Sequence, residues 1–153
     1  MAVLHTVPAG WASWSVKVLS GDEELTRLRI SLFRSKGSFQ LDGATFTIEP
    51  KGFFQLDAEL RKGASVIARA EKSSLTRRRF TITSAGYHLE LESQSWLGRE
   101  YALFLRKEEV GTIRRSGFLG RRCEMEFPDE VPVFLQVFLL YLALTQAKRE
   151  AAA

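Results

Sequence analysis

Short segments that alternate apolar and polar residues recur along most of the chain. The clearest early examples are Trp14, Val16 and Val18, followed by Leu28, Ile30 and Leu32. A period of two is typical of β-strands that have one face in a core and the other in solvent. About eleven such segments occur between residues 11 and 127. They predict a mainly β protein.

Turn signals separate the alternating segments. The strongest is Asp42-Gly43, which lies between Phe39 and Phe46 and favours a tight two-residue hairpin. Further signals follow the same spacing: Ser20-Gly21-Asp22, Lys62-Gly63 and Ala85-Gly86. Many short strands at regular spacing are typical of a barrel or a sandwich.

The segment 131–147 reads VPVFLQVFLLYLALTQA and is apolar on every side. A helix that is hydrophobic all round must be buried in protein or in lipid. We predict this helix at about residues 129–149, with Asp129 as its N-cap and Pro132 in its first turn.

Three environments would bury this helix. A tail anchor needs about 20 apolar residues, whereas the 17 residues here include several polar ones. A helix on an open sheet needs a polar outer face, and Gln136, Tyr141 and Thr145 supply only a thin stripe. We favour the third environment, a closed or nearly closed antiparallel β-barrel of about 11–12 strands around the hydrophobic C-terminal helix. Residues 1–153 would then form a single domain.

Composition is that of a folded globular protein, with 45% apolar and 26% charged residues. The single cysteine, Cys123, excludes an internal disulfide framework. The N-terminus has no basic start and no continuous apolar run, so it does not resemble a signal peptide. We therefore expect a cytoplasmic protein, with peripheral membrane association if it binds lipid.

Catalytic chemistry has little support in the residues. His5, ahead of the predicted strands, and His88 are the only histidines, and neither belongs to a nucleophilic set or to a metal-ligand spacing. His88 is predicted to face solvent. Cys123 alternates with Met125 and Phe127, so we expect a core residue. We predict no enzyme activity, no metal site and no cofactor.

Positive charge is concentrated in residues 61–122, which hold fourteen Lys and Arg against six acids. Such a segment can attract phosphate or an anionic membrane. The candidate anion- or lipid-binding residues are Lys72, Arg77, Arg78, Arg79, Arg121 and Arg122. Phe118 and Leu119 are candidates for a tip that enters a bilayer interface beside them. Alternatively, these basic side chains are merely solvated, and Phe118 and Leu119 close an end of the barrel.

The order of elements resembles the tubby-like C-terminal superfamily, which includes tubby, LURP-one-related proteins and phospholipid scramblases. The resemblance rests on residues 101–105 (YALFL), on residues 109–113 (EVGTI) and on the hydrophobic helix at 129–146. It implies a closed barrel of twelve strands around a central helix. It also implies binding of phosphoinositide headgroups through basic side chains on the barrel. No individual ligand residue of the family can be matched here.

Two main hypotheses for function follow. The first is a non-catalytic binding module for anionic phospholipid headgroups or another phosphorylated ligand. The second is a protein–protein interaction or scaffold domain, with Trp11 and Trp14 as part of a partner face. Nucleic-acid binding is a third and weaker option, because the aromatic residues fall largely on inward strand faces.

Overall fold

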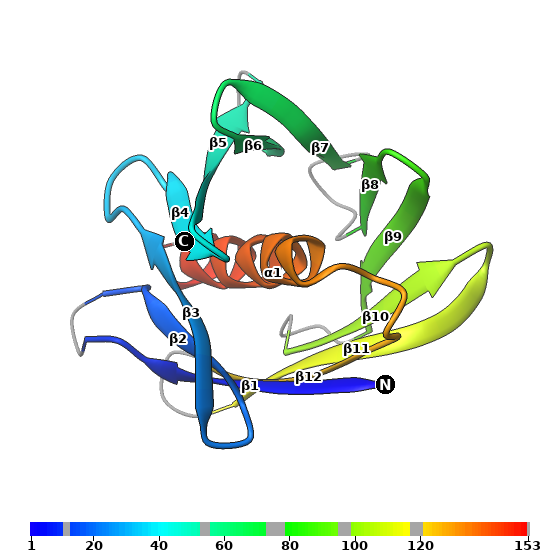
Figure 1. Cartoon of the computed structure of the whole chain (residues 1–153), viewed down its shortest axis with the longest axis horizontal. Helices are drawn as coiled ribbons and strands as arrows, with labels where there is room; N and C mark the ends of the chain where they lie inside the picture. Colours follow the sequence, from blue (N-terminus) through cyan, green and yellow to red (C-terminus); the bar gives the residue numbers. More distant parts are fainter. Residues whose placement is uncertain (11–12, 53–55, 73–78, 95–98, 117–120, 153) are drawn as a thin grey trace.

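Twelve antiparallel strands surround one helix in the computed structural model, which describes residues 1–10, 13–52, 56–72, 79–94, 99–116 and 121–152 (Figure 1). The strands are β1 (Ala2–Pro8), β2 (Val16–Ser20), β3 (Glu23–Ile30), β4 (Gly37–Leu41), β5 (Ala44–Lys51), β6 (Asp57–Lys62), β7 (Ser65–Lys72), β8 (Arg79–Ser84), β9 (Tyr87–Ser93), β10 (Glu100–Leu105), β11 (Glu108–Ser116) and β12 (Arg122–Phe127). The helix is α1 (Val133–Ala152). The predicted barrel around a C-terminal helix is confirmed.

Strand β1 closes the barrel, because it pairs with β2 on one side and with β12 on the other. The prediction that the strands start near residue 11 is therefore wrong. The sequence did not predict β1 because Thr6, a polar residue, occupies an inward-facing position and interrupts the alternation of apolar and polar residues. Its buried hydroxyl accepts a bond from the Cys123 backbone N–H at 2.9 Å and donates to the Arg121 carbonyl at 3.0 Å.

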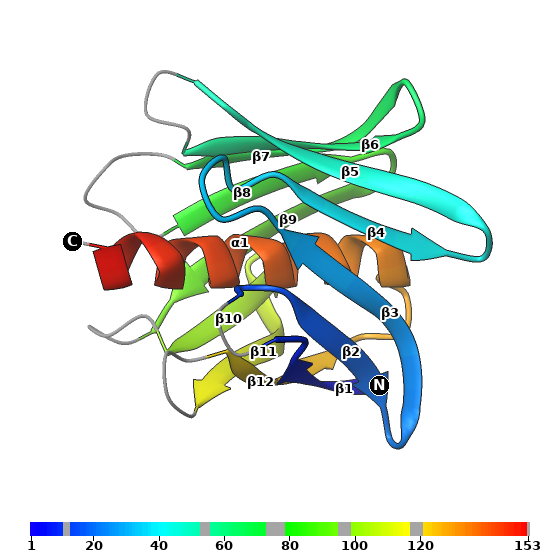
Figure 2. The same cartoon turned by 90° about the vertical axis from the view of Figure 1, so that its left-hand side faces the viewer.

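The two ends of the barrel differ (Figure 2). Tight turns join β2 to β3, β4 to β5, β6 to β7, β8 to β9 and β10 to β11 at the end where α1 begins. In the predicted hairpin, Asp42 and Gly43 both adopt positive φ angles, of 50° and 77°, as a type I′ turn requires. The connection between β3 and β4, residues 31–36, lies at the end where α1 finishes (Figure 2), since Ser31 and Ser35 accept bonds from Lys148.

Helix α1 runs through the barrel (Figures 1 and 2), and the side chains from Leu135 to Ala147 are buried. The predicted polar stripe is buried too, and each of its members has a backbone partner. Gln136 donates to the Val131 carbonyl at 2.8 Å, and the Thr145 hydroxyl donates to the Tyr141 carbonyl at 2.9 Å. Tyr141 donates to the Ser35 carbonyl at 2.6 Å. The helix is therefore apolar all round because the barrel surrounds it.

The helix begins later than predicted, at Val133. Asp129 is not its N-cap: the carboxylate lies 2.9 Å from the N-terminal amine of Met1. The Pro132 carbonyl accepts the first bonds of the helix, from Leu135 and Gln136, both at 3.0 Å. A proline disfavours helical geometry in the preceding residue, which explains why the chain up to Val131 stays outside the helix.

Strand β3 ends at Ile30, so Leu32 does not continue the inward face as its spacing predicted. The Ser31 backbone N–H donates to the Lys36 carbonyl at 2.9 Å, which turns the chain between β3 and β4. Leu32 is consequently 53% exposed and Phe33 is 96% exposed.

Candidate anion-binding surface

Four of the predicted basic residues lie within the described parts of the chain. Lys72 ends β7, Arg79 begins β8, Arg121 precedes β12 and Arg122 begins it. The other predicted site residues, Arg77, Arg78, Phe118 and Leu119, lie outside the described residues. Strands β9, β10 and β11 separate β8 from β12. The fold therefore places the described candidates in two separate regions of the barrel.

Arg79 is paired with carboxylates of the neighbouring strand. It lies directly across from Glu92 in the register, and its Nη2 atom is 2.9 Å from Glu92 Oε2. Its Nε atom is 4.0 Å from Glu90 Oε2. The hydrogen bond to Glu92 and the nearby negative charges raise the pKa of Arg79. Much of its charge is thus balanced within the protein.

Lys72 and Arg121 contact other parts of the protein. Lys72 Nζ donates to Gln146 Oε1 at 3.1 Å, which joins β7 to the last turns of α1. Arg121 is only 8% exposed, and its Nη1 atom donates to the carbonyls of Gly10 and Ser13. Arg121 thereby links the start of β12 to Gly10, which follows β1, and to Ser13, which precedes β2. Arg122 points outward and is exposed.

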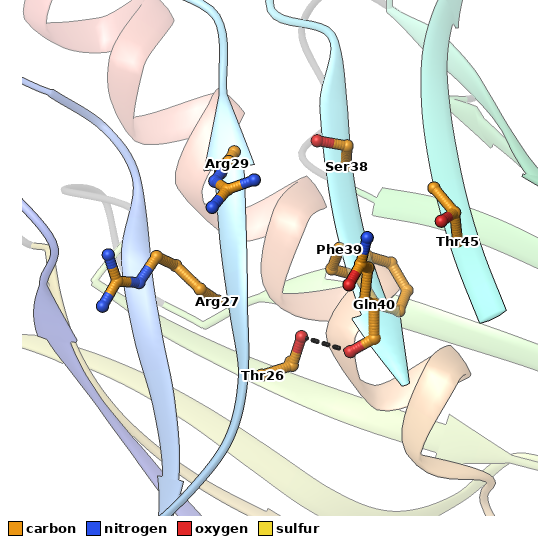
Figure 3. Close-up of a pocket in the computed structure, with 7 residues that line it drawn as sticks. All are labelled: Thr26, Arg27, Arg29, Ser38, Phe39, Gln40 and Thr45. Atoms are coloured by element: carbon orange, nitrogen blue, oxygen red, sulfur yellow. Dashed lines mark hydrogen bonds between the residues drawn. The ribbon is translucent and has the colours of Figure 1, made fainter. Parts of the chain in front are cut away.

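The outer face of β3, β4 and β5 holds two adjoining grooves. The first, of about 330 Å³, is shown in Figure 3, and the second is about 490 Å³. Arg29 and Ser38 line both grooves. The other lining residues of the first are Thr26, Arg27, Phe39, Gln40 and Thr45, and those of the second are Ile30, Ser31, Lys36, Gly37, Thr47, Ile48 and Glu49.

The first groove lies where the backbone pairing between β3 and β4 ends. β3 pairs with β4 only at Arg29 with Ser38 and at Ile30 with Gly37, whereas β4 pairs with β5 at five positions. Beyond the ladder the Thr26 hydroxyl donates to the Gln40 carbonyl at 2.7 Å, a bond drawn in Figure 3. This side-chain bond holds the two strands together where their backbones no longer pair.

Three of the residues that line the grooves are basic, Arg27, Arg29 and Lys36, and one, Glu49, is acidic. Lys17 on β2 lies directly across from Arg27 on β3, and like charges in such a pair repel. Among the residues that the structure describes, Arg27 has one ion pair, at 3.6 Å to Glu24, and its side chain extends toward β2 in Figure 3. Within the described ranges, no hydrogen bond or ion pair engages the Arg29 guanidinium or the Lys36 ammonium.

The grooves also offer uncharged hydrogen-bonding groups beside the arginines. The Ser38 hydroxyl, the Gln40 amide and the Thr45 hydroxyl come from β4 and β5 and line the same groove as Arg29 (Figure 3). A guanidinium can donate two parallel bonds to phosphate oxygens, and hydroxyl and amide groups can donate to the remaining oxygens. This arrangement suits a phosphate or another compact anion.

Sequence reasoning missed this surface because the charge count directed attention to residues 61–122. The usable signal was the placement of Arg27 and Arg29 between the inward residues Leu28 and Ile30. Such alternate positions lie on the outer face of one strand. The sequence did not indicate that β4 would pair with only the end of β3.

The predictions for the other reactive side chains can be compared directly with the fold. Cys123 is buried, and this burial raises its pKa to about 11, so the thiol is protonated at neutral pH. His88 is exposed on β9, as predicted. The described residues contain no group of three His, Cys, Asp or Glu that could hold a metal ion. In the same residues, no helix combines the length and apolarity needed to cross a membrane.

Comparisons with protein-family models, with curated proteins and with solved structures found no match.

Proposed function

We propose that this protein is a non-catalytic module that binds anionic phospholipid headgroups through the outer face of β3, β4 and β5. The observation that carries the proposal is Arg29, whose guanidinium lines both grooves and has no ion-pair partner among the described residues. Lys17, Arg27 and Lys36 add positive charge close by. An arginine of this kind is a strong binder of phosphate because its fork matches two phosphate oxygens.

A tubby-like relationship is part of the same proposal. The closed barrel around a hydrophobic helix is the fold that the resemblance implies. The family resemblance also implies headgroup binding by basic side chains on the barrel. The residues that line the grooves on β3, β4 and β5 are not the basic residues predicted from the sequence.

The test is co-sedimentation with phosphatidylcholine vesicles that contain or lack phosphatidylserine or a phosphatidylinositol bisphosphate. The variant is Arg29→Gln, and the matched control is Arg69→Gln, an exposed arginine on β7. A lost charge-assisted bond to phosphate is worth about 1.5–3 kcal/mol, so we expect Arg29→Gln to weaken binding at least about tenfold. The control should change it less than twofold.

Each other result has a definite meaning. An equal loss in both variants would indicate that only net charge matters. Undiminished vesicle binding by Arg29→Gln would reject this placement of the site. If the folded wild-type protein binds none of these vesicles, headgroup recognition itself is rejected.

The alternative function is a protein-interaction or scaffold domain. One observation favours it: Val3 on β1 is 60% exposed beside a groove of about 450 Å³ on β1, β11 and β12. Arg114, Glu124 and Glu126 give this groove charges of both signs. The predicted partner face was elsewhere, at Trp11 and Trp14. Trp11 lies outside the described residues, and Trp14 is half-buried against the core.

A further inference from the structure

The connection between β3 and β4 presents two apolar side chains to solvent. Phe33 is 96% exposed and Leu32 is 53% exposed; together they are called the apolar tip below. Burial of an apolar side chain of this size stabilises a folded protein. The fold forgoes that contribution here, and a neighbouring apolar pair at a loop apex is the arrangement that an interfacial anchor needs.

The base of this connection is held in place. The Ser31 backbone N–H donates to the Lys36 carbonyl at 2.9 Å, and the Lys36 N–H donates to the Ser31 hydroxyl at 3.0 Å. The end of α1 holds the same connection: Lys148 Nζ donates to the Ser31 carbonyl at 2.9 Å and to the Ser35 hydroxyl at 3.1 Å. The Ser35 carbonyl also accepts the bond from Tyr141 at 2.6 Å. These bonds determine where the apolar tip points.

Basic residues flank the apolar tip. Arg34 follows Phe33 directly, and Lys36 lies on the groove that Arg29 also lines. Glu49 is the acidic residue of that groove, and Lys51 lies 3.3 Å from its carboxylate. Lys and Arg side chains are attracted to an anionic membrane surface when they lie close to it. Apolar residues at an apex with cations behind them therefore match the boundary between acyl chains and anionic headgroups.

We infer that the apolar tip inserts into the interface of an anionic lipid bilayer, so that the end of the barrel where α1 finishes faces the membrane. This inference rests on the proposed headgroup binding. It specifies that the bound phosphate belongs to a membrane lipid, because a free phosphorylated metabolite would leave the apolar tip in water. The tip and the second groove are continuous through Ser31 and Lys36. Insertion would hold Arg29 at the level of the headgroups.

The first experiment reports insertion directly. Phe33→Cys is labelled with an environment-sensitive fluorophore, and Cys123 stays unlabelled because it is buried. The control label is placed at Asp22→Cys, in a turn at the opposite end of the barrel. We expect a blue shift, and quenching by spin-labelled lipid, only for position 33 and only with phosphatidylserine vesicles. A label at position 33 that stays in water on bound protein would overturn the inference.

The second experiment separates insertion from headgroup recognition. Leu32→Ser/Phe33→Ser is compared with Val3→Ser, another exposed apolar position. We expect the double variant to bind phosphatidylserine vesicles at least about fivefold less well and the control to be unchanged. Binding of soluble inositol trisphosphate, measured by calorimetry, should be the same for the wild type and the double variant.

The outcomes distinguish the two proposals. If Arg29→Gln weakens vesicle binding and the double serine variant leaves it unchanged, headgroup recognition stands and insertion is wrong. If the wild type binds inositol trisphosphate but no vesicle, the ligand is a soluble phosphate and insertion is again wrong. If it binds neither, both proposals fail.

Discussion

The hydroxyl of Tyr141, in the middle of α1, donates a 2.6 Å hydrogen bond to the backbone carbonyl of Ser35, in the connection between β3 and β4. Gly37 makes this contact possible. A Cβ atom on Gly37 would lie 3.0 Å from the Tyr141 ring. The central helix and the connection that carries the apolar tip are therefore directly linked.

Tyr141→Phe should remove this link without disturbing the ring. Burial raises the pKa of Tyr141, so the hydroxyl stays protonated and remains a donor. We expect a loss of about 1 kcal/mol in the free energy of unfolding, measured in urea. The control is Tyr87→Phe, whose hydroxyl donates to the Glu130 carbonyl at 2.8 Å in an exposed position. A larger loss in the control would contradict the structural role given to Tyr141.

The Arg121→Glu variant should unfold more readily than the wild-type protein. The substitution places a carboxylate where a buried guanidinium donates to the carbonyls of Gly10 and Ser13. Removing a charged partner from such bonds costs about 1.5–3 kcal/mol. The neighbouring Arg122→Glu changes an exposed side chain and should stay within about 0.5 kcal/mol. Thermal unfolding of the two variants provides the measurement. Equal stabilities would show that Arg121 has no such role.

Gly111→Ala should disrupt the pairing of β11 with β12. A Cβ atom at Gly111 would lie 2.5 Å from the Glu126 carbonyl oxygen, which is backbone and cannot rotate away. We expect a loss of more than about 2 kcal/mol in the free energy of unfolding. Gly10→Ala is the control, since its Cβ would lie 3.7 Å from the Ser13 Cβ, an ordinary contact. Similar denaturation midpoints for the two variants would refute the steric argument.

Cys123 should make folding depend on pH in the alkaline range. Its folded pKa of about 11 exceeds the unfolded value of 9.0, so the folded state favours the neutral thiol. The resulting stability, roughly 2–3 kcal/mol, is fully present below about pH 9 and is lost as the pH rises through about 11. Urea unfolding at several pH values should show this slope in the wild type and a smaller one in Cys123→Ala. Tyr141 contributes equally to both proteins, so parallel pH profiles would disprove the effect.

The sequence did not show which of the predicted basic side chains would be exposed. Arg121 and Arg122 are adjacent basic residues with the same sequence context, yet one is buried against backbone carbonyls and the other is exposed. Which of them is available to a ligand depends on Gly10 and Ser13, more than 100 positions away. Likewise, Leu32 keeps the strand alternation, and only the turn from Ser31 to Lys36 exposes it.

The sequence by itself determined most of the strands, the tight turns and the presence of the buried helix, because these follow from local side-chain periods and from residues such as Asp42-Gly43. The tertiary structure alone decided that Ala2 pairs with Phe127 to close the barrel. It also decided that β3 and β4 separate beyond Arg29 and Ser38. Both depend on the matching of backbone edges and curvature around the whole barrel, and no local pattern in the sequence carries that information.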